Sequence, residues 1–305
     1  MKIVFFGTPF FAAECLKYLI EKGVDVAAVV TQPDRPKGRS SQRVPSPVKE
    51  LAGIYGIPVF QPEKASNGEF LEAIGQLEAA LFVVVAYGQI LSQRLLDIPP
   101  LGCINVHASL LPKYRGAAPI QRCLMAGEKE TGVAIQKMVR QMDAGDVIGI
   151  AKVKVPFEMT FGELEERLIE LAKPLLLDVI QRYERGVPEG EPQNETGVSF
   201  APKIELEEGE IDWKKPAGEI HNLIRAFSPR PGAWCWICAG TDKKRLKVLR
   251  AKVVEGKGAP GERLKEGVVA AGEGAIELLE VQAEGKKAMS ALDWLRGQKN
   301  ILFYL

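Results

Sequence analysis

Cys103-Ile104-Asn105-Val106-His107 is a short, mostly apolar run, and the loop Ala108-Ser109-Leu110-Leu111-Pro112-Lys113-Tyr114-Arg115-Gly116 follows it. Side chains two positions apart in a strand point to the same face, so Asn105 and His107 project together where the run ends. Ligands of open α/β sheets bind outside the carboxyl ends of the strands. An amide can stabilise a developing oxyanion, and an imidazole can move a proton near neutral pH. The pair therefore predicts an acyl-transfer centre.

The segments before this run alternate short apolar strands with helical patterns, which is typical of an α/β fold with a doubly wound, Rossmann-like parallel sheet. Thr8 is a suitable N-cap and Pro9 a suitable first helical residue, so we expect a helix directly after the first strand. The turn there lacks the G-x-G-x-x-G pattern, which argues against a dinucleotide site. The expected strands are residues 2–6, 24–30, 58–60, 81–86 and 103–106, and the expected helices are residues 9–22 and 47–55, the latter capped by Ser46.

The chain changes character at residues 186–209, which are rich in Gly, Pro, Glu and Asn and lack apolar periodicity. We expect a linker there, between an N-terminal α/β domain (residues 1–185) and a smaller C-terminal domain (residues 210–305). Short β-like runs separated by glycines predict a small β-barrel in the second domain. The elements expected in this half are helices over 160–185 and 216–227 and strands over 233–238, 246–254, 267–271 and 275–281.

Composition restricts the class of protein. The 305 residues are 46% hydrophobic, which suits two globular domains. No apolar run approaches the roughly 18 residues of a membrane span, and the first residues resemble a strand rather than a secretory leader. We therefore expect a cytoplasmic protein with no membrane segment. The five cysteines include one C-x-x-C pair, Cys235 and Cys238, whose side chains would face opposite sides of a strand. A closed zinc site needs about four ligands, so we expect a structural strand here and no metal.

Basic residues gather in the C-terminal part of the chain. From Glu208 onward there are 17 Lys and Arg against 13 Asp and Glu. Lys243, Lys244 and Lys247 are among the six basic residues of positions 241–252, which contain one acidic residue. Such a patch suits a polyanion, whereas lysines on the outer face of a solvated strand pair would give the same pattern.

Asp143 and His221 each have an ordinary structural interpretation. Asp143 lies in the turn-rich Gln141–Asp146, where an aspartate is common without any catalytic role. A carboxylate beside His107 would nevertheless favour the imidazolium and hold the ring in one orientation. His221 lies among apolar residues of a predicted helix, so we expect a partly buried structural side chain.

The central stretch resembles the signature of the folate-dependent formyltransferases, in which Asn-x-His precedes a Ser-Leu-Leu-Pro loop and an aspartate follows. Here Asn105 and His107 precede that loop, and Asp143 stands 36 residues after His107. Thr31–Pro36 and Gly285–Ala291 resemble segments of the branch that formylates initiator methionyl-tRNA. Because the similarity spans the beginning, middle and end of the chain, the chain is identified as a member of this family.

The resemblance implies that Asn105, His107 and Asp143 are catalytic, with Asp146 as the weaker alternative to Asp143. It implies 10-formyltetrahydrofolate as the formyl donor, no metal, and a C-terminal domain similar to an oligonucleotide-binding fold. The implied folate-binding residues are Ser109, Leu110, Leu111 and Pro112 in the loop and Tyr87, Gly88, Gln89 and Ile90 after the strand over 81–86. For the second of these segments, a plain strand-to-helix turn remains the alternative.

Residues 31–50 carry a net charge of +3, which suits phosphate contacts at the end of a tRNA acceptor stem. The resemblance places Arg39 where the family reaches into that stem, although Ser40–Arg43 stands where the family often has glycine and consecutive lysines. The expected tRNA-binding residues are Arg35, Lys37, Arg39, Arg43, Lys243, Lys244 and Lys247.

We expect a monomeric enzyme that acts on initiator methionyl-tRNA. Two other functions are compatible with the sequence. One is formylation of a small amine, such as a nucleotide sugar or glycinamide ribonucleotide, and the other is RNA binding without catalysis.

Overall fold

Three stretches of the chain build each of two compact units. The computed structural model describes residues 1–36, 43–239, 242–297 and 301–303. The first unit contains Met1–Gly116, Thr131–Val153 and Glu166–Phe200, and the second contains Ala117–Glu130, Lys154–Glu165 and Ala201–Leu305. Among the described residues, no helix combines the length and the apolar composition needed to cross a bilayer.

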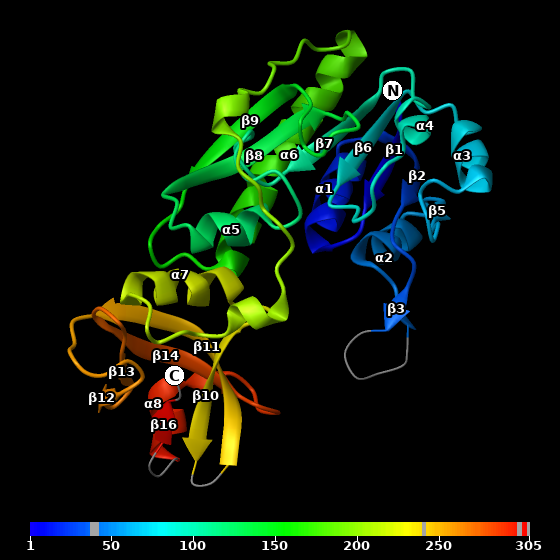
Figure 1. Cartoon of the computed structure of the whole chain (residues 1–305). Helices are drawn as coiled ribbons and strands as arrows, with labels where there is room; N and C mark the ends of the chain where they lie inside the picture. The colour runs from blue at the N-terminus through cyan, green and yellow to red at the C-terminus, as the bar shows by residue number, and fades with distance from the viewer. Residues whose placement is uncertain (37–42, 240–241, 298–300, 304–305) are drawn as a thin grey trace. The chain divides into compact units, whose positions relative to one another are not determined.

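The first unit is built on a seven-stranded sheet with the strand order β5-β2-β1-β6-β7-β8-β9 (Figure 1). The strands from β5 to β7 pair in parallel, and β8 joins β7 antiparallel, so the predicted parallel α/β sheet is confirmed. Chain order runs outward in both directions from β1 and β6, which makes their boundary the topological switch point where ligands of such sheets bind. The strands are β1 (Lys2–Gly7), β2 (Asp25–Val30), β5 (Val59–Phe60), β6 (Leu81–Val85), β7 (Cys103–His107), β8 (Glu130–Lys137) and β9 (Val147–Lys154).

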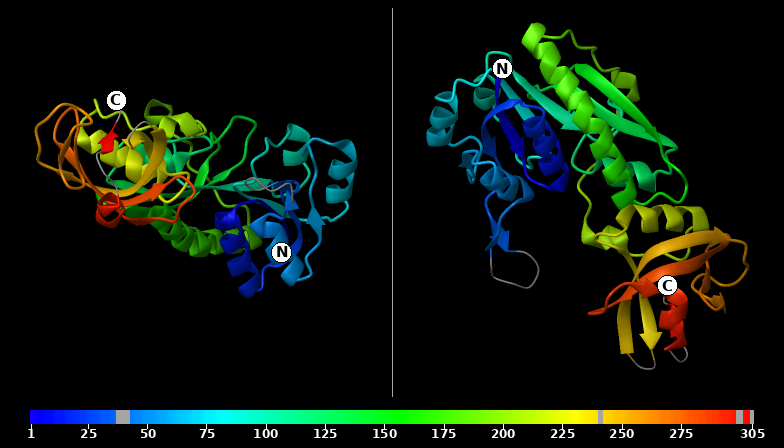
Figure 2. Two further views of the ribbon diagram at one scale, coloured as in Figure 1. Left: turned by 90° about the horizontal axis from the view of Figure 1, so that it is seen from below. Right: turned by 180° about the vertical axis from the view of Figure 1, so that it is seen from behind.

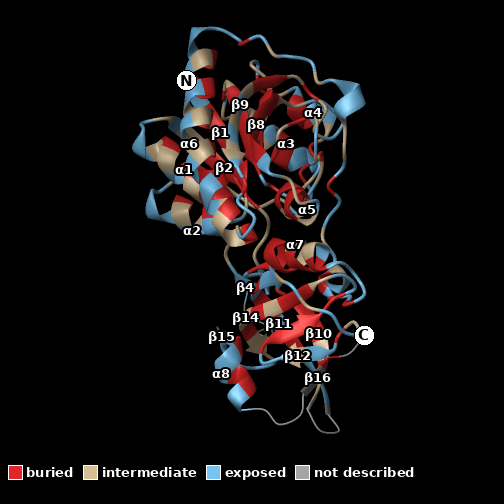
Figure 3. Ribbon diagram, turned by 90° about the vertical axis from the view of Figure 1, so that its left-hand side faces the viewer, coloured by how far each residue is buried: buried red, intermediate tan, exposed pale blue. Residues whose placement is uncertain are grey.

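Helices cover this sheet because its strands are apolar on both faces. Every residue of β6 is buried, as expected of a central strand between two helical layers, and Figure 3 shows the buried strands in red. Gly149 of β9 lies against Leu175 and Val179 of α6, the long helix that runs along β8 and β9 in Figure 2. The helices are α1 (Phe10–Glu21), α2 (Pro47–Ile54), α3 (Gly68–Gly75), α4 (Gln93–Leu96) and α6 (Phe161–Arg185), and the short strands β3 (Arg35–Pro36) and β4 (Arg43–Val44) form a separate pair.

The expected N-cap at Thr8 is wrong. Helix α1 begins after Pro9 without a side-chain cap. The Thr8 hydroxyl donates instead to the carbonyl oxygen of Tyr87 at 2.8 Å and so joins the loops that follow β1 and β6. The other predicted cap is confirmed, since Ser46 Oγ accepts from the backbone N–H of Lys49 at 3.1 Å at the start of α2.

The second unit contains an antiparallel sheet with the order β12-β13-β14-β11-β10-β16, to which β15 adds by pairing with β14. The prediction of a smaller C-terminal β domain is confirmed, and the structure shows that its strands pair antiparallel. Its strands are β10 (Ala233–Ala239), β11 (Asp242–Val254), β12 (Arg263–Lys265), β13 (Val268–Ala270), β14 (Ala275–Ala283), β15 (Met289–Ser290) and β16 (Ile301–Phe303). The remaining helical elements of the chain are α5 (Pro119–Met125), α7 (Ala217–Phe227), α8 (Ala291–Arg296) and the 3₁₀ turns η1 (Glu195–Gly197) and η2 (Leu206–Gly209).

His221 of α7 is a buried structural side chain, as the apolar pattern around it predicts. Its ring stacks on Phe157 with centroids 4.4 Å apart, and Nε2 lies 3.2 Å from a carboxylate oxygen of Glu158. Burial lowers the pKa of His221, although the nearby carboxylate of Glu158 acts in the opposite direction. The folded chain therefore favours the neutral imidazole.

Stability should consequently fall as the pH drops through the range in which the unfolded histidine, with an ordinary pKa of about 6.5, takes up a proton. We expect the thermal midpoint to decrease between pH 7.5 and pH 5.5, and to decrease less in His221→Phe, which keeps an aromatic ring against Phe157. Thermal unfolding followed at both pH values checks this difference. Equal decreases in the two proteins would show that burial does not hold His221 neutral.

Candidate active site

Strand β7 presents Asn105 and His107 on one face at its carboxyl end, as the spacing predicts. In the pairing with the antiparallel β8, Asn105 lies opposite Gln136, and His107 lies opposite Ala134. Directly opposed side chains share a face of the sheet. The structure therefore places two amide side chains and one imidazole together beside the switch point of the sheet.

The carboxylate of Asp143 joins these side chains. Its Oδ1 accepts from Nε2 of Gln136 at 2.8 Å and from Nδ2 of Asn105 at 3.3 Å. Its Oδ2 accepts from the backbone N–H of Gly116 at 2.9 Å and lies 3.7 Å from Nδ1 of His107. Only 14% of the Asp143 side chain is exposed, so these N–H groups replace the water that a carboxylate would otherwise bind.

The ring of His107 is held in one tautomer. Its Nε2 lies 2.8 Å from the carbonyl oxygen of Tyr114, which can only accept, so Nε2 carries a hydrogen. Nδ1 is then the nitrogen that can take up or release a proton, and it faces Asp143. The His107 side chain is only 6% exposed, so this nitrogen is nearly closed off from solvent.

Asp143, rather than Asp146, is the aspartate that the structure brings to His107. Asp143 has a positive φ of 51°, a left-handed conformation that aspartate tolerates better than most residues. Asp146 begins the approach to β9, and its carbonyl oxygen accepts from the backbone N–H of Lys137 at 2.9 Å.

The loop after β7 is packed against the sheet. Ser109 is fully buried, and its hydroxyl donates to the carbonyl oxygen of Lys113 at 2.6 Å. Leu111 is buried against Ala134 and Val147, while Leu110 and Pro112 are partly exposed. Among the loop residues expected to bind folate, Leu110 and Pro112 therefore have side-chain surface that a ligand can reach.

The second expected folate segment is divided between the core and the surface. Tyr87 is buried with its ring against Phe6 (centroids 5.5 Å apart), and burial raises its pKa to about 12. The Gln89 amide accepts from Ala65 N at 2.7 Å and donates to the carbonyl oxygen of Pro62 at 3.1 Å. By contrast, Gly88 is exposed, Ile90 is 89% exposed and Gln89 is partly exposed, so these three members of the segment offer surface to a ligand.

The expected tRNA-binding residues of the first unit are partly described. Arg35 and Arg43 are exposed and lie opposite each other's neighbours in the short β3–β4 pair. Lys37 and Arg39 lie outside the described residues.

In the second unit, the three lysines occupy two faces of β11. Lys243 lies opposite Cys238, and Lys247 lies opposite Trp234, so these two lysines share a face with Arg245. Lys244 occupies the alternate position and points to the other face. On the shared face, the Arg245 guanidinium lies 4.2 Å from the Trp234 ring centroid.

The C-x-x-C pair behaves as a strand segment. Cys235 and Cys238 lie in β10, where Cys235 is buried and Cys238 is partly exposed. Burial raises the pKa of the Cys235 thiol, which keeps it protonated and unreactive. In the part of the chain that the structure describes, no three His, Cys, Asp or Glu side chains group as metal ligands.

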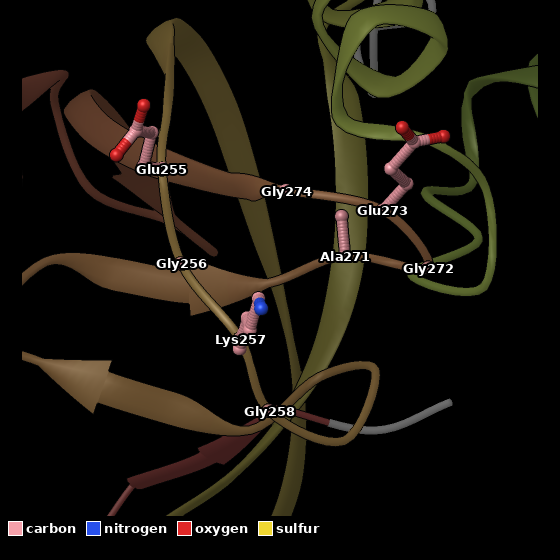
Figure 4. Close-up of a pocket in the computed structure, with 8 residues that line it drawn as sticks. All are labelled: Glu255, Gly256, Lys257, Gly258, Ala271, Gly272, Glu273 and Gly274. Atoms are coloured by element: carbon pink, nitrogen blue, oxygen red, sulfur yellow. The ribbon is translucent and has the colours of Figure 1, made fainter.

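A hollow of about 730 Å³ lies in the second unit between the ends of β11 and β14 (Figure 4). Its lining is largely glycine backbone, with Glu255, Lys257 and Glu273 as the charged side chains. This lining contains no amide or imidazole side chain, in contrast to the group around Asp143.

Comparisons with known proteins agree with this geometry. The family description "Formyl transferase" matches residues 1–180, and "Formyl transferase, C-terminal domain" matches residues 203–299. The chain belongs to the formyl transferase family. It is 50% identical to the methionyl-tRNA formyltransferase of Protochlamydia amoebophila, over 100% of this chain and 98% of that protein. It is 46% identical to the methionyl-tRNA formyltransferase of Methylobacterium sp., over 98% of this chain and 97% of that protein.

A solved structure shares the fold of this formyl transferase. HypX from Aquifex aeolicus in complex with tetrahydrofolic acid has a TM-score of 0.68 and 18% sequence identity, over 100% of this chain and 51% of that chain.

Some residues of the site could not be found from the sequence. Gln136 lies in an apolar strand, and only its pairing with Asn105 reveals its position beside Asp143. Gly116 contributes through its backbone N–H, for which the residue type is no signal. Gln193, in the stretch expected to be a linker, donates to the carbonyl oxygen of Asp143 at 2.8 Å.

His107→Ala and Asn105→Ala should each lower kcat for formyl transfer by at least about a hundredfold, because each removes a donor beside the developing oxyanion. Binding of folate, measured by fluorescence titration, should remain largely intact. Near-normal turnover in either variant would remove that residue from the catalytic group.

Asp143→Asn should also lose most turnover, since an amide brings no negative charge to His107 and turns donors toward Asn105 and Gln136. Asp146→Asn is the matched control, because it removes the same charge three positions along the chain. If Asp146→Asn alone is inactive, Asp146 and not Asp143 is the catalytic carboxylate.

Proposed function

We propose that this formyl transferase moves the formyl group of 10-formyltetrahydrofolate to the amino group of methionine on initiator methionyl-tRNA. The observation that carries the proposal is the convergence of Asn105, His107 and Asp143 at the carboxyl end of β7. Relatives named methionyl-tRNA formyltransferase that align over nearly the whole chain support the choice of amine.

The folate supplies a formyl carbon bound to a nitrogen that can leave. The second N–H of the Asn105 amide, which is not needed for Asp143, is free to donate to the oxyanion that forms when the amine attacks. Nδ1 of His107 can take the proton that the attacking amine loses, and the resulting N–H can donate to the oxyanion. It can then give this proton to the folate nitrogen as the bond from that nitrogen to the formyl carbon breaks. The negative charge of Asp143 stabilises the protonated Nδ1 of His107 and keeps the imidazole ring in its orientation.

The folate expectation fits the exposed residues at the strand ends. Ile90 offers apolar surface, and Gly88 leaves the backbone open beside it. Leu110 and Pro112 offer similar surface in the loop after β7. Under the proposal, these four residues contact the donor. The buried Tyr87, Ser109 and Leu111 and the hydrogen-bonded, partly exposed Gln89 shape the loops that present them.

Transfer RNA is proposed to bind through the basic residues of both units. Arg39 would reach the acceptor stem, with Arg35, Lys37 and Arg43 on phosphates around it. Lys243, Lys244 and Lys247 would supply affinity that does not depend on sequence. In this proposal, the enzyme is a cytoplasmic monomer, with residues 1–185 as the catalytic domain, 186–209 as a linker and 210–305 as the tRNA-binding domain.

A substrate panel tests the function directly. Charged initiator tRNA, a nucleotide amino sugar and glycinamide ribonucleotide are each incubated with 10-formyltetrahydrofolate labelled in the formyl group. We expect label on the methionyl-tRNA alone, and none with His107→Ala. Transfer to one of the small amines instead would support the alternative enzyme, and tRNA binding without transfer would support a non-catalytic protein.

Lys243→Ala and Lys247→Ala should each reduce the salt dependence of tRNA binding, because each lost phosphate contact lowers the slope of log K against log salt by about 0.7–0.9. Initiator and elongator tRNA should be affected alike. Lys17→Ala, which removes an exposed lysine from α1, is the control and should leave the slope unchanged. A slope unaffected by the β11 variants would show that this face does not touch phosphates.

A further inference from the structure

Gln193 holds the backbone of the loop that carries Asp143. Its Nε2 donates to the carbonyl oxygen of Asp143 at 2.8 Å and to that of Gly145 at 2.7 Å. Its Oε1 accepts from Nε and Nη2 of Arg115 at 3.1 and 2.9 Å. Both hydrogens and the oxygen of this amide are therefore engaged within the first unit.

Arg115 determines which way the Gln193 amide points. The arginine is only 1% exposed, and a guanidinium can only donate, so the amide oxygen must face it and the NH₂ group must face the loop. Nη2 of Arg115 also donates to Glu195 at 3.0 Å, which balances the buried positive charge. Arg115 therefore directs the two N–H groups of the Gln193 amide toward the carbonyl oxygens of Asp143 and Gly145.

The loop needs such support because its conformation is constrained. Asp143 has a positive φ of 51°, a backbone conformation that costs conformational energy in any residue other than glycine. A Cβ on Gly145 would collide with the carbonyl oxygen of Lys137, so the loop lies directly against β8. With Gln193 bound to the carbonyl groups of both residues, the turn between them has little freedom.

The same stretch of chain also holds the other side of the site. Ser199 Oγ accepts from the backbone N–H of Tyr114 at 2.9 Å, and the Ser199 carbonyl oxygen accepts from Arg115 N at 2.9 Å. The carbonyl oxygen of Tyr114 is the group bound by Nε2 of His107. Residues 193–199 thus bind the backbone of Asp143 and the backbone of Tyr114, the residue whose carbonyl oxygen binds His107.

We propose that Gln193, oriented by Arg115, is a positioning residue for formyl transfer. It keeps the Asp143 carboxylate within reach of Asn105 and His107 without touching the reacting atoms. The inference rests on the proposed function to the extent that Asp143 takes part in that reaction.

Gln193→Glu is the most direct variant, because it keeps the shape and the acceptor for Arg115 but places an oxygen against two carbonyl oxygens. We expect kcat for methionyl-tRNA formylation to fall by about a hundredfold, the scale expected when a reacting group is misplaced by about 1 Å, while KM for both substrates changes little. Gln141→Glu is the matched control, since it adds the same charge at an exposed position next to the same loop, and it should retain the wild-type kcat. Gln193→Met, which adds no charge, is the second variant and should reproduce the loss.

A double-mutant cycle separates positioning from a general structural effect. In an Asp143→Asn background, Gln193→Glu should lower kcat by no more than about twofold, because the group that it positions is already disabled. Amide hydrogen exchange gives a readout that does not depend on activity. Exchange at Gly116, whose N–H binds the Asp143 carboxylate, should accelerate in Gln193→Glu while the thermal midpoint stays near that of the wild type.

The two proposals fail in different ways. If the wild-type chain formylates no amine in the substrate panel, the proposed function is wrong, and the exchange at Gly116 still reports whether Gln193 holds the loop. If the wild type is active and Gln193→Glu keeps its kcat, or lowers it equally with and without Asp143, the positioning role is overturned.

Discussion

The solvation of one carboxylate organises this active site. Asp143 is mostly removed from water, and a buried anion is tolerated only when N–H groups replace that water. The three donors come from different elements. Asn105 lies on β7, Gln136 lies on β8, and the backbone of Gly116 belongs to the loop between β7 and α5. Because no one element can satisfy the carboxylate, its burial draws strand ends and loop together before any substrate arrives. The site is therefore organised in advance, which is what electrostatic stabilisation of an oxyanion requires.

The topology of the sheet explains why this group forms where it does. Strand order reverses between β1 and β6, and the loops leaving these strands are joined by the bond from Thr8 to Tyr87. The next strand, β7, pairs with β6 on the side away from β1. The antiparallel β8 then brings Gln136 opposite Asn105.

Local patterns predicted much of this molecule. The apolar runs located β1, β6, β7 and the main strands of the second unit, because burial and alternation act within a few residues. The prediction failed where a side chain has a distant partner. Thr8 bonds across the switch point instead of capping α1. Gln193 gave no signal, since its role depends on a loop 50 residues away and on Arg115.

The stretch around Gln193 looks like a linker by composition, yet its length is constrained. Glu191 pairs with Val147, Gln193 with the Asp143 loop, and Ser199 with Tyr114. An extended residue spans about 3.3–3.6 Å, so one insertion or deletion between these anchors would carry at least one bond out of reach. Exposed residues of this stretch can therefore be substituted in related chains. A change in the number of its residues would instead require the loop that carries Asp143 to adopt another conformation.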